Sequence, residues 1–392
     1  MSSLSTELYP LAQYLDLNIV QNSNDPNAPQ TAVVRFNEIR NQPYLKNPSL
    51  YQLAIVRFAL DSSALPCVIP DIQTNQSNKN LTSYSFTMTY DYLGTTYEFQ
   101  QFVIFVPQDL SQPDPVQVNG NWQTPISGIK YYYINTFQKF LQMINTALSS
   151  CYNGLNALVV GAGGSLPTTN KPFFEIDPYN FNLLLNADQL GYAETLANPI
   201  KIYMNNSCFT LFSGFQTINY GSNSSITNGK NYLLNIYATP SNSNIYIYPT
   251  YNAIQMYGEG QSTVALWNPV QRIVFTTSGL LPVVSTSTPN PIPFGSDSNQ
   301  VSTGNVANIE NILTDFIVPF DNVNTYKPQI HFQTSGPFRF QDLFSTGPLN
   351  AIQLNIFWGD RFGNLYPFEL KQGGFGSVKL LFQRKDAYNI SL

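Results

Sequence analysis

The fold of this chain is constrained most strongly by a stretch near its C-terminus, residues 349–385, which reads LNAIQLNIFWGDRFGNLYPFELKQGGFGSVKLLFQRK. Apolar side chains occupy every second position from 352 to 358, the pattern of a β-strand with one buried face. Residues 359–364 then supply turn chemistry, with two glycines, an aspartate and an asparagine. Alternation resumes at 365–370 and again at 378–382, on either side of a Gln-Gly-Gly turn. We therefore predict a three-stranded antiparallel meander that closes a β-domain.

The alternation also assigns side chains to the two faces of these strands. Asn355 is predicted to point away from the core, because successive side chains of a strand lie on opposite faces. A shift of one residue would exchange the two faces, so the assignment can be tested by substitution. The side chains predicted to line one common core are Ile352, Leu354, Ile356, Val378, Leu380 and Phe382.

Charged side chains are scarce. They make up 10% of the residues, against roughly 25% in typical soluble domains, whereas aromatic residues make up 14%. A surface with few long charged side chains has less ordering entropy to lose when neighbours bury it, and a Tyr-rich, Lys/Glu-poor composition favours interface cores. The same residues suit the strands of a secreted β-sandwich. Composition leaves both classes open.

The charge balance and the N-terminal region exclude several classes of protein. A formal net charge of −5 and a sequence pI near 4.9 argue against a nucleic-acid coat. No basic segment followed by an apolar run marks a signal peptide, and no stretch reaches the roughly 18 apolar residues of a membrane span. Cys67, Cys151 and Cys208 are odd in number and widely separated. They are predicted to be small buried side chains, not a disulfide framework.

Strands are predicted along most of the chain. Residues 1–30 are expected to form an N-terminal arm that is ordered by contacts with a partner. A hairpin is predicted from residues 81–92 and 97–106, with Gly94 in its turn. Long polar loops are expected at 107–128 and 285–305, and strands at this spacing are typical of a sandwich or barrel. Further strands are predicted at 31–36, 51–60, 173–176, 181–185, 200–204, 208–215, 232–238, 245–249, 262–267 and 270–277, with residues 65–72 extended.

One amphipathic helix is predicted at about residues 135–150. Asn135 is a candidate N-cap and Gly154 a candidate stop. The helix would lie across a sheet edge or barrel end, because its apolar side chains form a single stripe. The stripe consists of Ile134, Phe137, Leu141, Ile144 and Leu148.

Candidate catalytic groups are few. His331 is the only histidine, and a lone histidine on a strand is more often structural than a general base. It could not form a zinc site of ordinary spacing, and no G-x-S-x-G motif supplies a nucleophile for it. The sequence VVGAGGS at residues 159–165 imitates a nucleotide-binding turn but lacks the third glycine and a P-loop lysine. It is interpreted as a flexible loop.

Charged clusters have simple explanations. The acidic pairs Asp109/Asp114 and Glu175/Asp177 lack the dense carboxylate spacing of a calcium loop. Asp360 and Arg361 are interpreted as a turn with a local or intersubunit ion pair. Basic side chains near both ends could face packaged DNA, although solvated charges or intersubunit partners are the simpler interpretation. These are Arg35, Arg40, Lys46, Arg57, Arg384 and Lys385.

Three segments together resemble the penton, or minor capsid, proteins of virophages and polinton-like DNA viruses. The first contains WGDRFGNLYPFEL and SVKLLFQRK in the C-terminal stretch. The second contains PYLKNPSLYQLAIVRFALDSSALPCVIP within residues 36–70. The third is YYYINTFQKFLQMINTAL at 131–148, followed later by LWNP at 266–269. The resemblance touches both ends and part of the middle, and none of its segments is catalytic.

The resemblance implies a mainly β protein, a viral jelly-roll β-sandwich with long loops, one amphipathic helix and an inserted upper region. It implies a homopentamer at the fivefold vertices of an icosahedral double-stranded DNA virus, in contact with double-jelly-roll major capsid proteins. No enzymatic activity, catalytic residue, cofactor or metal is expected. The protein would be made in the host cytoplasm and reside in the virion, where outer loops would be placed to meet a host receptor.

The chain is longer than one jelly roll requires. The jelly-roll domain is therefore predicted from residues 31–106 and 261–392, with 107–260 as the insertion. Two other classes remain open at this point. A double-jelly-roll major capsid protein would show two comparable strand series and form trimers. A carbohydrate-binding or hydrolytic β-sandwich would use the aromatic side chains and acidic pairs.

Overall fold

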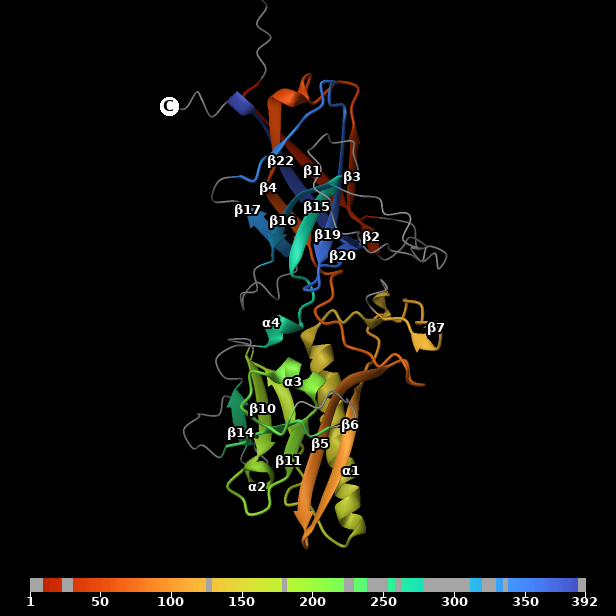
Figure 1. The fold of residues 1–392 in the computed structure, drawn as a ribbon, viewed down its shortest axis with the longest axis vertical. Helices are drawn as coiled ribbons and strands as arrows, with labels where there is room; N and C mark the ends of the chain where they lie inside the picture. Colours follow the sequence, from red (N-terminus) through yellow and green to blue (C-terminus); the bar gives the residue numbers. More distant parts are fainter. Residues whose placement is uncertain are drawn as a thin grey trace, which may run out of the picture. The chain divides into compact units, whose positions relative to one another are not determined.

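The protein divides into two compact units. Unit 1 combines Met1–Leu65 with Val270–Leu392, and unit 2 is the continuous segment Pro66–Pro269. Figure 1 shows the elements of both in a computed structural model. The structure describes residues 10–22, 31–124, 129–177, 182–221, 229–237, 253–257, 263–277, 311–318, 329–333 and 338–386. The predicted strand at 245–249 and the predicted loop at 285–305 lie outside these residues.

Unit 1 contains two antiparallel sheets that pack face to face. The first, sheet A, has the order β1-β22-β4-β17, with the short β18 also beside β4. Its central strand is β4, because the strand pairs on both sides over most of its length. The strands are β1 (Ala12–Val20), β4 (Tyr51–Asp61), β17 (Gln329–Gln333), β18 (Gln341–Asp342) and β22 (Phe375–Arg384).

The second sheet of unit 1, sheet C, has the order β16-β15-β19-β20, and β3 also pairs with β19. Strands β2 and β21 pair with each other in a separate two-stranded ribbon, and in the sequence they adjoin β3 and β20 of sheet C. The strands are β2 (Thr31–Val33), β3 (Arg35–Ile39), β15 (Arg272–Thr277), β16 (Asn311–Ile317), β19 (Ala351–Gly359), β20 (Leu365–Pro367) and β21 (Glu369–Lys371), and a 3-10 turn, η1, covers Pro48–Leu50.

Aromatic side chains join the two sheets across the core of unit 1. The ring of Phe58 on β4 lies 5.2 Å from that of Phe275 on β15 and 5.0 Å from that of Phe316 on β16. Tilted aromatic pairs at this separation add to the burial energy. All six side chains predicted to face one core, from Ile352 to Phe382, are completely buried. The inward assignment from period-two alternation is confirmed.

The predicted three-stranded meander is wrong in its pairing. The turn at 359–364 does connect β19 to β20, and Gly363 has a φ of +89° there. The chain then crosses over, so that β22 pairs with β1 and β4 in the opposite sheet. Alternation specifies which face of a strand is buried, but not which neighbouring strand it pairs with. The two inward faces therefore meet across a sandwich and not within one sheet.

The second face of β19 is also covered. Asn355, predicted to point outward, is 4% exposed, and Phe357 belongs to a small apolar cluster with Val274 and Leu365. The prediction that one face of this strand is free is therefore wrong. Alternation cannot reveal this burial, because Val274 and Ile312 of the same cluster are far from β19 in the sequence.

Unit 2 is built on the sheet β12-β13-β11-β5-β6, with a separate sheet β14-β10-β9. The predicted hairpin is present as β5 and β6, and the long helix α1 packs against both strands. A second small hairpin is formed by β7 and β8. The strands are β5 (Leu81–Tyr92), β6 (Thr95–Ile104), β7 (Gln117–Val118), β8 (Asn121–Trp122), β9 (Phe173–Ile176), β10 (Leu183–Asp188), β11 (Lys201–Met204), β12 (Thr217–Asn219), β13 (Tyr232–Leu234) and β14 (Ala253–Tyr257).

Helix α1 (Phe137–Gly161) is longer than predicted. Its N-cap is Thr136, whose side chain accepts a hydrogen bond from the Lys139 backbone N–H, and not Asn135. Gly154 does not stop the helix. It lies against the ring of Phe99, where a Cβ would overlap the ring. The glycine allows close packing of helix on strand.

Two predicted strands of unit 2 are helices. The segment 208–215 falls largely in α3 (Asn206–Phe212), and 262–267 falls in α4 (Val264–Trp267). Asn205 starts α3 by accepting a hydrogen bond from the Cys208 N–H, a capping arrangement that the apolar run concealed. A short helix, α2 (Gln189–Tyr192), and a 3-10 turn, η3 (Lys130–Tyr132), complete the unit.

The unit boundaries differ from the predicted domains. The hairpin β5–β6, predicted in the jelly roll, belongs to unit 2, which begins at Pro66 and ends at Pro269. Part of the predicted N-terminal arm is strand β1, which pairs with β22 along its whole length. Its polar sequence concealed it because every second residue of an edge strand can face solvent.

Candidate assembly surfaces

The residues that could have suggested catalysis lie on a strand and at the end of a helix. His331 lies exposed on β17, opposite Ala59 of β4. The glycine-rich segment 159–165, predicted to be a flexible loop, forms the last residues of α1 and the turn after it. Gly163 has a φ of +81° in this turn, and its N–H donates to the Val160 carbonyl. This is a helix C-terminus that uses glycine in the left-handed region.

Carboxylates of the two acidic pairs make hydrogen bonds and an ion pair with neighbouring side chains. Asp109 accepts hydrogen bonds from Ser111 and Gln112, whereas Asp114 pairs with Lys79 at 2.6 Å. Glu175 accepts a 2.8 Å hydrogen bond from the Asn186 side-chain amide. Within the described ranges, no group of three or more His, Cys, Asp or Glu side chains could hold a metal ion.

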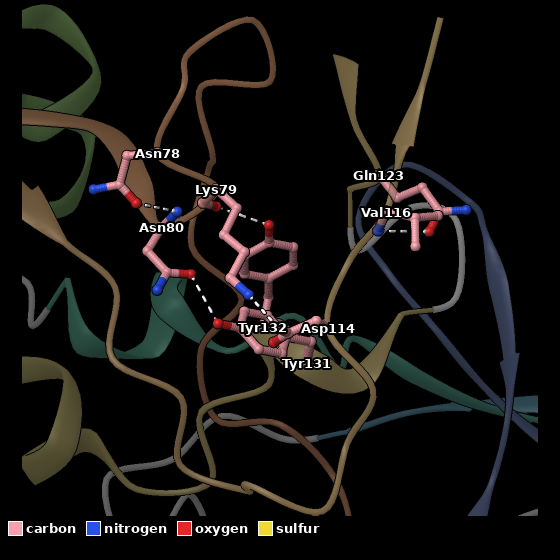
Figure 2. Close-up of polar contacts among 8 residues, drawn as sticks. All are labelled: Asn78, Lys79, Asn80, Asp114, Val116, Gln123, Tyr131 and Tyr132. Atoms are coloured by element: carbon pink, nitrogen blue, oxygen red, sulfur yellow. Dashed lines mark hydrogen bonds and ion pairs between the residues drawn. The ribbon is translucent and has the colours of Figure 1, made fainter. Parts of the chain in front are cut away.

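Lys79 is the centre of a polar clasp that joins three loops of unit 2 (Figure 2). Its Nζ pairs with Asp114 and lies 5.3 Å from the centre of the Tyr131 ring. The Tyr131 hydroxyl donates to Asn80 Oδ1 at 3.0 Å, and the Tyr132 hydroxyl donates to the Lys79 carbonyl at 2.8 Å. The hydrogen bond to Asp114 raises the pKa of Lys79, and burial raises the pKa of Tyr132 to about 12. The clasp fixes the loops around η3.

The cysteines carry free thiols. Cys151 and Cys208 are completely buried, as predicted, and Cys67 is half-buried, with its Sγ 3.1 Å from the Asn135 carbonyl. Burial raises the pKa of the Cys151 thiol to about 12 and raises that of Cys208 as well. The thiolate is the reactive form, so both side chains act as small apolar groups.

The outer face of sheet A carries a row of charges. Asp16 on β1 lies 3.4 Å from Lys379 on β22 and 3.5 Å from Arg57 on β4. Lys379 also lies 5.3 Å from the centre of the Tyr14 ring. These side chains are 30–50% exposed, so each pair contributes little to stability. The row does offset part of the positive charge that was considered for DNA contact.

Other charged residues also have partners within the protein. Lys385 lies 3.7 Å from Asp342, Arg384 pairs with Asp386, and Arg40 lies over the Tyr44 ring. Asp360 accepts hydrogen bonds from the Phe362 and Asn364 N–H groups and so closes its own turn. Arg361 lies over the adjacent Phe362 ring, 4.8 Å from its centre. The carboxylate therefore organises the turn through amides, which the predicted ion pair did not anticipate.

Edge strands and exposed apolar side chains mark the surfaces that assembly could cover. In sheet A, β1 and β17 are the two edges, and β1 carries the exposed side chains Tyr14 and Val20. An edge strand presents unpaired backbone groups that another chain can contact. In unit 2, the edge strand β6 and helix α1 enclose a groove of about 240 Å³, whose lining includes Ile104, Val106 and Met143.

No helix within the described part of the chain is long and apolar enough to cross a membrane. The family model for the Sputnik minor capsid protein V18/19 matches residues 13–384, which is nearly the whole chain and both units. The chain belongs to this minor capsid protein family. It is therefore a structural component of the virion capsid, and the expectation of a structural rather than an enzymatic role is confirmed.

Two relatives come from the Sputnik virophage. Structural protein V19 is 30% identical over 221 residues, which are 54% of this chain and 94% of V19. The uncharacterized protein V18 is 38% identical over 136 residues, which are 34% of this chain and 74% of V18.

Two solved structures are similar over almost the full length. A chain in the cryo-EM structure of the Sputnik virophage has a TM-score of 0.77 at 29% identity, with 97% of this chain and 99% of that chain covered. The crystal structure of the mavirus penton protein has a TM-score of 0.57 at 18% identity, with 95% and 99% covered. The predicted mainly β, jelly-roll capsid fold is confirmed.

The sequence analysis did not predict that Leu93 of unit 2 is an exposed apolar residue. Leu93 lies in the β5–β6 turn, beside the Gly94 that was predicted there. An aliphatic residue directly before the glycine of a two-residue turn is unusual, because that position favours Asn, Asp or Gly. The Leu93-Gly94 dipeptide was therefore the sequence signal that could have identified this exposed apolar residue.

Proposed function

We propose that this family member is a penton, with five copies at each fivefold vertex in contact with double-jelly-roll major capsid proteins. The observation that carries the proposal is the contrast between the two units. Among the described residues, unit 1 is a sandwich of two five-stranded antiparallel sheets, whereas unit 2 combines a five-stranded and a three-stranded sheet with a long helix packed on the larger one. A double-jelly-roll protein would need two comparable sandwiches, so a single jelly roll favours the penton.

The geometry of a closed ring guides where the contacts would lie. A fivefold ring needs a heterologous interface, in which one flank of a subunit meets a different flank of the next. Sheet A offers two different flanks, β1 and β17, and the exposed Tyr14 and Val20 supply apolar area on the first. Contact with packaged DNA has less support, because two of the basic residues considered for it, Arg57 and Lys385, lie beside Asp16 and Asp342.

Light scattering on the purified full-length chain, coupled to size-exclusion chromatography, tests the proposal. Five copies of 43.9 kDa give a mass of about 220 kDa, and three give about 132 kDa. We expect the larger mass at high protein concentration, or fivefold density at the vertices when major capsid protein is present. A stable trimer in both settings would overturn the proposal.

A pair of variants tests the β1 flank. Val20→Lys places a charge on the exposed end of this edge strand and should lower the pentameric fraction. Leu190→Lys is the matched control, because Leu190 is similarly exposed but lies on α2 in unit 2. Equal pentamer formation by both variants would exclude Val20 from the interface.

A further inference from the structure

The turn between β5 and β6 breaks two local rules. It has two residues, Leu93 and Gly94, with φ angles of +49° and +78°. Positive φ at both positions is the pattern of a type I′ hairpin turn, in which the first position favours Asn, Asp or Gly. A leucine there is strained by its Cβ, and its side chain is also 85% exposed.

The same unit contains the favoured version of this turn. The β7–β8 hairpin has Asn119 and Gly120 at the equivalent positions, with φ angles of +52° and +79°. The fold therefore does not require leucine at position 93. A residue that is both strained and exposed where a better one is available points to selection for a contact that the isolated chain does not show.

Other apolar side chains share this end of the unit. The Tyr92 hydroxyl reaches the Gly163 carbonyl at 3.4 Å, which places the hairpin turn beside the end of α1. Leu158 and Val160, in the last turn of α1, are 43% and 55% exposed. We call Leu93, Leu158 and Val160 the apolar tip. Figure 1 shows the β5–β6 turn and the end of α1 at the same end of this unit.

The apolar tip is free of charge in its sequence surroundings. No charged residue occurs between Asp91 and Glu98, or anywhere in residues 140–170. Asp91 lies 3.8 Å from Lys201, and Glu98 pairs with Lys230, so the charges set back from the turn are balanced. The two segments that carry the tip therefore offer no charge to an acidic or a basic partner, and the free energy of binding would come from apolar burial.

We propose that the apolar tip inserts into the interfacial region of an uncharged lipid bilayer. Protruding aliphatic side chains without cationic neighbours fit a deformable apolar layer, and such binding scales with the apolar area buried. Because no basic residue flanks the turn, anionic lipid is not needed.

Fivefold assembly favours a planar partner, and this step rests on the proposed penton function. The five copies of any point in a fivefold ring lie in one plane perpendicular to the axis. A bilayer can therefore receive all five tips at once, whereas a single small protein cannot. Five weak insertions held in one ring combine into strong binding without any new contact.

Flotation with vesicles of pure phosphatidylcholine, and with vesicles that also contain phosphatidylserine, tests this inference on the full-length protein. Wild type should bind both equally and without loss at high salt. Leu93→Asn recreates the Asn-Gly turn of residues 119–120, so the melting temperature should be unchanged or higher. Its affinity for vesicles should fall by at least about tenfold, the effect of losing one inserted leucine.

Leu110→Asn is the matched control. Leu110 is 86% exposed, and its loop is held near the start of α1 by Gln108, whose side chain accepts a hydrogen bond from the Asn135 N–H. It therefore lies near the other end of a helix of 25 residues, about 37 Å long. Vesicle binding by this variant should equal that of wild type.

The outcomes separate this inference from the penton proposal. Light scattering on the same samples reports the oligomer independently of vesicle binding. A pentamer that binds no vesicles, or binds them regardless of Leu93, overturns the inference alone. Loss of the pentamer in Leu93→Asn would show that the tip is a protein contact and overturn it too. Leu93-dependent binding by a chain that never forms pentamers would uphold insertion and overturn the penton.

Discussion

Leu354 and Asn355 are adjacent on β19, and both are buried although they lie on opposite faces. Leu354 lies in the core between the sheets of unit 1, where an apolar side chain contributes through transfer from water and close packing. Asn355 is a polar side chain at 4% exposure, and a buried amide must be matched by hydrogen bonds. The two positions therefore tolerate different changes.

Leu354→Ala should lower the free energy of unfolding by about 2–5 kcal/mol, because it leaves a cavity in a packed core. Leu354→Met should cost less than about 1.5 kcal/mol, since volume and apolar character are kept. Leu354→Asp should prevent soluble expression by burying an unpaired carboxylate. Urea unfolding of each purified variant measures the first two effects.

Asn355→Asp tests the covered second face. From the alternation alone, this change should fold normally, but the burial of Asn355 predicts clear destabilisation. Unfolding curves that coincide with wild type would show that solvent reaches this face. The period-two pattern was enough to place Ile352 and Leu354 inward. It could not predict the burial of Asn355, because alternation describes one strand and not what packs on its second face.

The side chain of Asn205 connects helix α3 to strand β5 through hydrogen bonds. Its Oδ1 accepts from the Cys208 N–H at 2.9 Å and from the Ser85 N–H at 3.1 Å, and its Nδ2 donates to the Ser83 carbonyl at 2.7 Å. The register of β5 shifts between Leu81 and Ser85, where backbone groups leave the ladder with β6. One side chain thus caps a helix and satisfies a β-bulge.

Asn205→Ala should destabilise the protein by roughly 3 kcal/mol or more, since it removes buried hydrogen bonds and leaves backbone partners unmatched. Thr136→Ala, at the exposed cap of α1, should cost only about 1 kcal/mol. Denaturant titrations of both variants give the comparison. Similar costs for the two would mean that Asn205 acts as a helix cap alone.

Helices and strands with a clear hydrophobic periodicity were predicted correctly. Those that depend on contacts with residues distant in the sequence were not. The β5–β6 hairpin and α1 have clear periodicity, so their existence followed from the sequence. Helix α3 depends on the cap at Asn205, and its apolar run is equally typical of a buried strand. Gly154 was mistaken for a stop signal, because its contact with Phe99, on a different element, cannot be read from the local sequence.

At the scale of the whole molecule, the two units differ in how the chain forms them. Unit 2 is one continuous segment, and its core cluster, from Val68 to Trp267, lies entirely within it. Unit 1 is assembled from both ends of the chain, with β4 from the first part between β22 and β17 from the second. The boundary at Pro66 could not be read from the sequence, because it falls within residues 65–72, which were predicted to be one extended segment.

We expect unit 2 to fold as an isolated fragment, whereas the C-terminal segment of unit 1 should not fold by itself. A fragment of residues 66–269 keeps all the strands of its sheets and a domain-sized core. A fragment of residues 270–392 lacks β1, β3 and β4, and so loses the centre of sheet A. We expect cooperative unfolding of the first fragment and none from the second, as followed by circular dichroism.

The three tryptophans allow the same comparison inside the intact chain. Trp358 lies in unit 1, stacked 4.2 Å from Tyr366, whereas Trp122 and Trp267 lie in unit 2. In full-length Trp358→Phe, tryptophan fluorescence therefore reports unit 2 alone. Its unfolding midpoint should match that of the 66–269 fragment, because the unit carries its own core. A much lower midpoint for the 66–269 fragment would show that unit 2 depends on unit 1 for its stability. A folded 270–392 fragment would show that the sandwich of unit 1 does not need β4.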